Sequence, residues 1–546
     1  MIGKRKIKIL IPAVIILFVT VSVFANGVSN ERNTPIANNA MGINAHLSFD
    51  CSINFTEDLC KCIKEAGIKS IRFDVYWSYK DFLFQEKVCD KVLYFASKYN
   101  IDVLLNFPQM DYNLKNEKKE KWIETLVYYA KRYNGVTKVK VEDSDTVITV
   151  NNFEILNEPD INHKKKALSI KETYNLIKES SIAIKGVRKN AKIVLPGLSS
   201  RDESTKQLLN YRDSNGYTLA HYCDVFNVHI YRNNINAFEK ELNEWKKLKQ
   251  HTEFENKEFW LTEYGNTLWY ETVENQAEML VKQMLYAYSI GIDRVYYYQL
   301  HQFGGNFFNN TNQGEDYYGI IEPSVSNSYC SFLRNDGEFK TAICDGDATK
   351  KVLVKSNNTD TLFLYWIDKN IIRRLKTKGL AIGGRDIQIN KILIKESNVQ
   401  EKLLWSGNMT FSQTNQVISI PPSLFERITS SDKIAVCISH KIADNKWIRV
   451  KPLPAFLSYK FISSFLQEGS TDFAYIKDSM GLKYKVSWKT PNGMYRYCFW
   501  SDNILGYCNT ISSLNIKMYD IYGTPIKSGD INNFKMPVFI ESKVPL

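Results

Sequence analysis

Between residues 41 and about 300, short and nearly uniform apolar runs alternate with longer stretches in which apolar residues recur every three or four positions. The longer stretches predict amphipathic helices, and one of them, 56–66, ends at Gly67, the residue type favoured just after a helix. Strands written as continuous apolar runs are typical of a parallel sheet covered on both faces. The predicted strands are 42–46, 70–74, 102–106, the run that leads into Glu158, 192–196, 225–231, 258–263 and 294–300. Eight such repeats favour an α/β fold, a closed (β/α)8 TIM barrel.

The helix expected after the eighth strand does not follow it directly. Strand patterns separated by turn residues come first, and the next helical pattern begins only at Pro454. The residues expected on its buried face are Leu457, Phe461, Ile462, Phe465 and Leu466. We therefore predict a barrel formed by 41–330 plus 451–468, with an inserted β domain at 331–446. The alternative is a simple C-terminal β region with an incidental helix.

Residues 470–546 return to strand patterns. Asn492-Gly493 lies between two alternating runs, 484–488 and 494–500, which is the signature of a β-hairpin. We expect a small C-terminal β-sandwich beside the barrel at 470–546. A second hairpin is predicted at 136–150, inserted ahead of the fourth barrel strand.

The N-terminus has the pattern of a targeting segment. Basic residues at positions 4, 5, 6 and 8 precede an uncharged, mostly apolar run from 9 to 24, and Val23-Phe24-Ala25 fits a cleavage site. We predict a signal peptide at 1–25, with a retained N-terminal anchor, and so a membrane association through this segment, as the alternative. Either interpretation places the rest of the chain outside the cytoplasm, secreted or in the cell envelope.

Charge and motif content exclude several functions. The net charge of +12 is spread over 546 residues and no dense Lys/Arg tract interleaves with aromatics, so we expect no nucleic-acid partner. Dinucleotide-binding, P-loop and HExxH motifs are absent from the sequence, and its ten cysteines form no CxxC pair. We predict no cofactor and no metal. The oligomeric state stays open.

Two glutamates carry the clearest chemical signal. Glu158 in Asn157-Glu158-Pro159 and Glu263 in the run 260–265 each follow a strand-like apolar run. The carboxyl ends of barrel strands meet at one face. Two carboxyls at that face suit cleavage of a glycosidic bond, in which one protonates the leaving oxygen and the other attacks the sugar. A structural ion pair is the alternative for either residue taken alone.

Four other residues are expected to serve these carboxyls. Asn157 is placed to reach a sugar hydroxyl, and Arg72 on the second strand to pair with Glu263. His229 and Tyr231 alternate along the sixth strand and share a face, so that Tyr231 is expected to hydrogen-bond Glu263. The alternatives are a core role for His229 and a bridge from Arg72 to another acid. As an acid, Glu158 is expected to have a raised pKa, and Glu263 a lowered one.

Further candidates for substrate contact lie at or just past predicted strand ends. They are His46, Trp77, Asn106, Trp269, Tyr298 and Gln299. Aromatic rings at such positions offer platforms for sugar stacking, and packing in the core is the alternative for each of them.

The two glutamate motifs resemble those of clan A of the glycoside hydrolases. By that resemblance Glu158 is the acid/base and Glu263 the nucleophile, with His229, Tyr231 and Arg72 as accompanying site residues. The small sandwich resembles the one attached to family 39 and its relatives. The resemblance covers about 41–325 and 450–546. Tyr298 and Gln299 stand where a tryptophan is usual in the clan.

The sequence therefore predicts an exported, retaining glycosidase with an oligo- or polysaccharide substrate. The resemblance implies a covalent glycosyl-enzyme intermediate and commonly β-linked glycans. Export and the extra β domain favour endo cleavage. A catalytically inactive glycan-binding barrel and a transglycosylase acting on exported polysaccharide are the alternatives.

Overall fold

The fold is taken from a computed structural model. The residues that it describes are 28–47, 53–75, 82–108, 116–141, 144–162, 168–268, 270–301, 317–325, 329–333, 339–343, 361–368, 380–385, 387–396, 402–411, 416–420, 433–442, 448–477, 483–501, 516–527 and 537–545.

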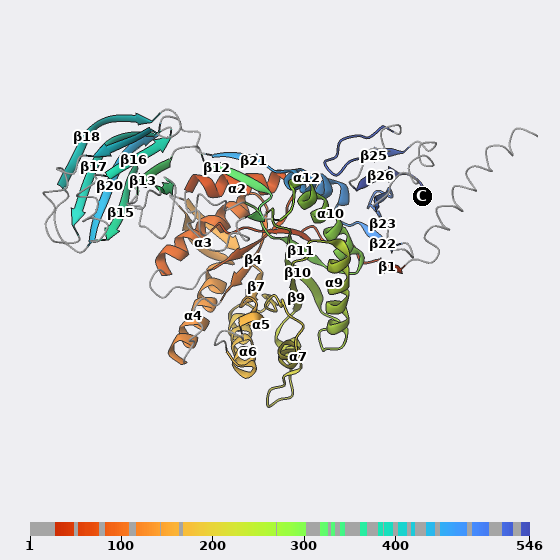
Figure 1. Cartoon of the computed structure of the whole chain (residues 1–546). Helices are drawn as coiled ribbons and strands as arrows, with labels where there is room; N and C mark the ends of the chain where they lie inside the picture. Colours follow the sequence, from red (N-terminus) through yellow and green to blue (C-terminus); the bar gives the residue numbers. More distant parts are fainter. Residues whose placement is uncertain are drawn as a thin grey trace, which may run out of the picture.

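Eight parallel strands close into a barrel, as the alternation of apolar runs predicts (Figure 1). In chain order they are β2 (Met41–Asn44), β3 (Ser70–Asp74), β4 (Asp102–Phe107), β7 (Asn152–Ile155), β8 (Lys192–Val194), β9 (Val225–Ile230), β10 (Glu258–Tyr264) and β11 (Arg294–Tyr297). The last strand pairs with the first, with Tyr296 opposite Gly42, which closes the ring. The predicted (β/α)8 fold is confirmed.

Helices surround the barrel (Figure 1). They are α2 (Ile53–Glu65), α3 (Phe82–Lys98), α4 (Asn116–Arg132), α5 (Pro159–Asn162), α6 (Ile170–Val187), α7 (Glu203–Asn210), α8 (Leu219–Tyr222), α9 (Ile235–Gln250) and α10 (Val273–Ser289). Their apolar faces and the outward side chains of the strands form the main core. A separate buried cluster, Leu104, Val194, Val225, Trp260 and Tyr296, comes entirely from barrel strands. The predicted hairpin is also present, as β5 (Asn134–Val141) and β6 (Ser144–Thr149).

Helix α12 (Pro454–Leu466) packs beside α10 and closes the ring of helices. The Tyr459 hydroxyl donates to the carbonyl of Gly42 on β2, which ties this distant segment to the first barrel strand. Its buried face contains Phe456, Tyr459, Ile462, Phe465 and Leu466. The expectation that Leu457 shares this face is wrong: the side chain is exposed, since it points about 100° away from its buried neighbour Phe456.

The described chain between the barrel and α12 forms three further sheets, one of two strands and two of four strands. Strand β12 (Ile321–Val325) pairs antiparallel with β21 (Ile448–Pro452), so the segment leaves and returns at one place. The strands of the two four-stranded sheets are β13 (Tyr329–Leu333), β14 (Phe339–Ile343), β15 (Thr361–Asp368), β16 (Leu380–Arg385), β17 (Ile387–Glu396), β18 (Lys402–Phe411), β19 (Gln416–Ile420) and β20 (Lys433–Ile442). The division into domains at 331–446 stays a prediction.

The C-terminal strands form a six-stranded antiparallel sheet whose edge strand comes from the other end of the chain. Strand β1 (Val28–Arg32) pairs with β22 (Thr471–Lys477), a pairing that the sequence analysis missed. The other members are β23 (Lys483–Lys489), β24 (Tyr495–Ser501), β25 (Lys517–Tyr519) and β26 (Val538–Ser542). Aromatic side chains fasten this sheet to α12: the Phe465 ring lies 5.8 Å from Trp488.

In the part of the chain that the structure describes, no helix combines the length and apolar character needed to cross a bilayer. The predicted signal segment at 1–25 lies outside the described residues.

Candidate active site

Arg72 lies at the centre of a buried ionic network inside the barrel. Its Nε is 2.6 Å from Glu154 Oε2, and its Nη1 is 2.6 Å from Glu263 Oε1. Asn44 and Asn157 accept from the same guanidinium at 3.0 and 2.7 Å. Arg72 and Glu154 are both fully buried, where a charge is stable only with close partners. The predicted pairing of Arg72 with Glu263 is therefore confirmed, and the alternative of a bridge to another acid holds as well.

Glu154 is the buried acid that the sequence analysis missed. Its Oε1 accepts from Arg72, from the Asn227 amide at 3.1 Å and from the backbone N–H of Gly197 at 3.1 Å. A signal was available: an acid within the apolar strand 152–155 must point either to solvent or to a buried cation. With alternation along the strand, Glu154 faces the barrel interior, as Arg72 does on β3.

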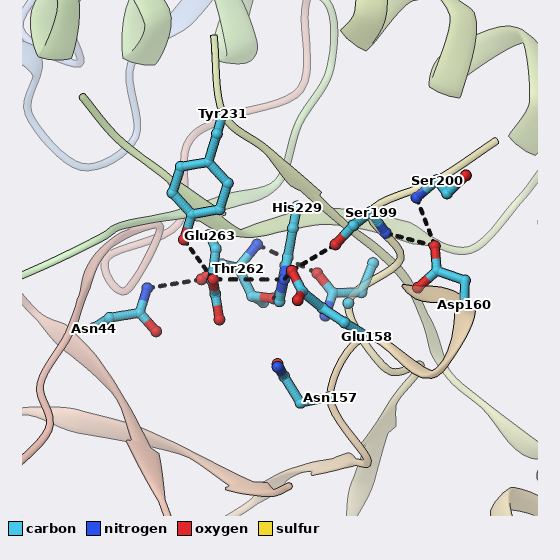
Figure 2. A network of polar contacts seen from close by, with 12 residues as sticks. Asn44, Asn157, Glu158, Asp160, Ser199, Ser200, His229, Tyr231, Thr262 and Glu263 are labelled. Carbon is cyan, nitrogen blue, oxygen red and sulfur yellow. Dashed lines mark hydrogen bonds and ion pairs between the residues drawn. The ribbon is translucent and has the colours of Figure 1, made fainter. Parts of the chain in front are cut away.

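Glu263 is held from two sides. Arg72 donates to its Oε1, and the Tyr231 hydroxyl donates to its Oε2 at 2.5 Å, so the predicted tyrosine contact is confirmed (Figure 2). Burial raises the pKa of the Tyr231 hydroxyl, and the neighbouring Glu263 charge raises it further. The hydroxyl therefore stays protonated and acts as a donor, which keeps one Glu263 oxygen in a fixed place.

Glu158 follows β7 on an irregular turn. Leu156 and Glu158 have φ values of 69° and 46°, in the left-handed region that costs non-glycine residues energy. The turn brings the Glu158 carboxylate back over the barrel, where its Oε1 accepts from His229 Nδ1 at 2.8 Å and from Ser199 Oγ at 2.5 Å (Figure 2). Its side chain keeps 23% of its surface exposed, against 10% for Glu263. Glu158 is thus the more accessible of the two.

His229 lies between the two carboxylates. Its Nδ1 is 2.8 Å from Glu158 and 3.6 Å from Glu263, and its Nε2 is 3.0 Å from Thr262 Oγ1. The approach requires a glycine at 197, since a Cβ there would lie 1.9 Å from the imidazole Nε2. His229 is thus a site residue as well as a buried one, so the two alternatives considered for it are not exclusive.

The direction of the Glu158 pKa corrects the sequence analysis. Burial alone raises the pKa of Glu158, but the His229 hydrogen bond and charge, together with Ser199, outweigh burial and leave the pKa below its usual value. Burial lowers the pKa of His229, but Glu263 and Glu158 outweigh it, and the pKa is raised. The expectation of a raised Glu158 pKa is wrong, because the sequence did not reveal that His229 and Ser199 both contact the carboxylate.

The two glutamates and His229 form one compact cluster. One ligand atom from each of Glu158, His229 and Glu263 can be chosen so that all three lie within 4.8 Å of one another. Such a trio offers oxygen and nitrogen ligands to a cation. Here His229 lies 2.8 Å from Glu158, and Arg72 lies 2.6 Å from Glu263.

Asp74 joins two of the other predicted residues. His46 Nδ1 lies 3.1 Å from one Asp74 oxygen, and the Asn106 amide donates to the other at 2.8 Å. Burial favours a raised pKa for Asp74, but His46, Arg72 and Asn106 outweigh it, so the pKa is well below its usual value. The Asp74 carboxylate is therefore ionised and fixed on the same strand as Arg72, two residues further along β3.

Aromatic rings form a chain of contacts from His46 to Tyr231. The Tyr298 ring lies 5.3 Å from His46 and 5.9 Å from Tyr231, and Tyr318 lies 5.5 Å from both tyrosines. Gln299, the next residue, is fully buried. Trp77 and Trp269 lie outside the described residues, so their predicted role in substrate contact stays a prediction.

Comparison with known proteins agrees with this geometry. Residues 112–306, which include Glu158 and Glu263, match the family model described as glycosyl hydrolase catalytic core. The barrel carries a glycosyl hydrolase catalytic core. The predicted resemblance to clan A glycoside hydrolases is confirmed by this match and the closed barrel. No curated protein matches the chain.

Solved structures share the architecture at low identity. A family 39 glycoside hydrolase from Bacteroides cellulosilyticus matches with a TM-score of 0.50 and 12% identity, over 92% of this chain and 82% of that one. An endo-1,4-β-mannanase from Rhizomucor miehei matches with a TM-score of 0.39 and 15% identity, over 53% and 94%. A glucosidase from Croceicoccus marinus matches with a TM-score of 0.41 and 13% identity, over 76% and 99%. At 12% identity, the likeness to the family 39 glycoside hydrolase shows the fold alone.

Proposed function

We propose that this glycosyl hydrolase core cleaves glycosidic bonds with retention of configuration, with Glu158 as acid/base and Glu263 as nucleophile. The observation that carries the proposal is the closeness of the two carboxylates, which have oxygens within 4.8 Å of each other. Retaining enzymes place their carboxyl groups about 5–5.5 Å apart, whereas inverting enzymes need about 6.5–9.5 Å to admit a water between carboxylate and sugar.

In the first step Glu263 attacks the anomeric carbon while a proton passes to the departing glycosidic oxygen, whose bond to that carbon breaks. Arg72 and Tyr231 hold the two Glu263 oxygens in place, so that the carboxylate is oriented for attack. The raised pKa of His229 favours a proton on its imidazole, whose Nδ1 lies 2.8 Å from Glu158 Oε1. A bound sugar excludes water from Glu158, which favours its neutral form and draws that proton onto the carboxylate. Glu158 then donates it to the leaving group.

In the second step Glu158, now ionised, takes a proton from water, and the water oxygen displaces Glu263 from the anomeric carbon. Two inversions at one carbon give net retention. We further propose that the substrate is a β-linked polysaccharide, cleaved internally outside the cytoplasm. The basic and apolar N-terminal segment supports export.

The two glutamates are tested by replacing each with alanine and supplying azide. Glu263→Ala is expected to lose hydrolysis of aryl glycosides by more than about 10³-fold, because the nucleophile is removed. It should keep its fold at reduced stability, because the buried Arg72 retains Glu154 as a partner. Azide should restore turnover in both variants, giving an azide of inverted configuration with Glu263→Ala and of retained configuration with Glu158→Ala.

Glu253→Gln serves as the control, since this exposed acid pairs with Arg212 outside the cluster. It is expected to keep full activity. Undiminished hydrolysis by Glu263→Ala would rule out the assignment of the nucleophile.

A further inference from the structure

The exit of the fifth barrel strand contributes a contact to Glu158 that neither motif contains. Ser199 lies just beyond β8, and its Oγ is 2.5 Å from Glu158 Oε1, the same oxygen that His229 contacts. Ser199 is 41 residues away from Glu158 along the chain. The parallel pairing of β7 with β8 brings the two together.

A buried carboxylate fixes the position of Ser199. Asp160 is 2% exposed, and its Oδ2 accepts from the backbone N–H groups of Ser199 at 2.8 Å and of Ser200 at 2.5 Å. Glu158 is bonded to the same strand exit, with its N–H donating to the Gly197 carbonyl at 3.2 Å. Figure 2 shows the Asp160 carboxylate on one side of the Ser199 backbone and Glu158 on the other. The turn after β7 is therefore hydrogen-bonded to the exit of β8 through the Glu158 backbone and through the Asp160 side chain.

We propose that Ser199 is a positioning residue that orients the Glu158 carboxylate, and that Asp160 holds Ser199 in place for this task. A hydroxyl suits an acid/base that changes its charge twice in each cycle, since it donates to the ionised carboxylate and can rotate when the carboxyl is protonated. The role of Ser199 in catalysis rests on the proposed function, whereas its hydrogen bond to Glu158 and the effect of that bond on the Glu158 pKa do not.

The charged groups that face Glu158 come from four elements. His229 on β9 and Arg72 on β3 favour its ionised form, whereas the charge of Glu263 on β10 and that of Asp160 on α5 disfavour it. Ser199 adds a neutral hydrogen bond that also favours the ionised form. Removing the hydroxyl should therefore raise the pKa of Glu158 while leaving the other charges in place.

The test is a carboxyl ¹³C NMR titration of Glu158, assigned by the loss of its signal in Glu158→Gln. Ser199→Ala is expected to raise the Glu158 titration midpoint by about one pH unit, the size of one hydrogen bond to a charged group. Ser199→Thr, which keeps the hydroxyl, should restore the wild-type midpoint. Ser200→Ala is the matched control and should leave it unchanged, because its side chain contacts the backbone of Asp202 instead.

Asp160→Ala is expected to raise the Glu158 midpoint by less than Ser199→Ala does, because it releases Ser199 but also removes a negative charge that disfavours ionised Glu158. In the double variant the midpoint should not exceed that of Ser199→Ala. In activity assays, the basic limb of kcat/KM should move to higher pH in Ser199→Ala, whereas a merely structural role would lower kcat/KM without moving the limb. An unchanged Glu158 midpoint in Ser199→Ala would overturn the proposal. A protein that hydrolyses no glycoside would refute the proposed function, and the NMR titration would still decide the role of Ser199.

Discussion

The two carboxylates of the site have the same side chain but opposite kinds of support. Glu263 is held by a guanidinium and a phenol, groups that keep their protons at every pH of interest. Glu158 is held by an imidazole, which can gain and lose a proton, and by a hydroxyl, which can rotate about its C–O bond. Permanent partners suit a group that must stay ionised until it attacks. Adjustable partners suit a group that gains and loses a proton.

The supports also differ in how deeply they lie in the barrel. Arg72 is bonded to Glu154, whose other partners are Asn227 and the backbone of Gly197, so the Glu263 side is part of the barrel interior. The Glu158 side rests on a turn with positive φ values and on the exit of β8. We expect substitutions on the Glu263 side to cost both stability and activity, and those on the Glu158 side to change mainly the pH dependence.

The largest effect is expected from Arg72→Met. The change leaves the carboxylates of Glu154 and Glu263 buried without a cation, and breaking a buried ion pair in this way costs about 3–5 kcal/mol. Denaturant unfolding should show this loss, and glycoside hydrolysis should fall with it.

Glu154→Gln is the milder control for that experiment. The amide keeps an acceptor for Arg72, which retains its pair with Glu263, so the loss should be nearer 1–3 kcal/mol. Wild-type stability in Arg72→Met would contradict the expectation that the supports of Glu263 contribute more to stability than those of Glu158.

Tyr231→Phe tests the Glu263 side without removing a charge. Losing one hydrogen bond to a charged group, worth about 1.5–3 kcal/mol, should lower kcat about 10–100-fold and leave the pH profile in place. Steady-state kinetics across pH would measure both. Tyr217→Phe, at an exposed ring stacked on His221, should behave as wild type. A shifted profile in Tyr231→Phe would mean that Tyr231 acts on the acid/base instead.

The smallest effect is a change in the pH dependence of stability with His229→Gln. Because the folded pKa of His229 is raised, its contribution is fully present below its unfolded value of 6.5 and is lost as pH rises through the folded pKa. Glu158 has a lowered pKa, so its contribution is present above 4.5 and is lost as pH falls. The difference in melting temperature between wild type and His229→Gln should therefore be largest between these values and shrink at higher pH.

In Glu158→Gln, the part of the stability loss at falling pH that Glu158 causes should disappear, because the variant has no carboxylate to protonate. Melting temperatures that differ by a constant amount at every pH would contradict the coupling of Glu158 to His229.

Much of the barrel can be predicted from the sequence, because the patterns that specify its strands and helices are local. Apolar runs and helical periodicity reveal the eight strands, and a carboxylate that follows such a run must lie at the carboxyl face of the barrel. The same alternation places Arg72 in the interior, where it needs an acid. Glu158, Glu263, Arg72, His229 and Tyr231 could be named for this reason.

Tertiary structure decided the contacts beyond the expected pairs of Glu263 with Arg72 and Tyr231. Glu154 is 82 residues from Arg72, and no local pattern shows that this second acid also faces the guanidinium. The Ser199 contact, the pairing of β1 with β22 and the direction of the Glu158 pKa depend in the same way on which strands lie side by side in the fold. Periodicity fixes the face on which a side chain lies, whereas its partners, and with them its charge, depend on how distant strands align.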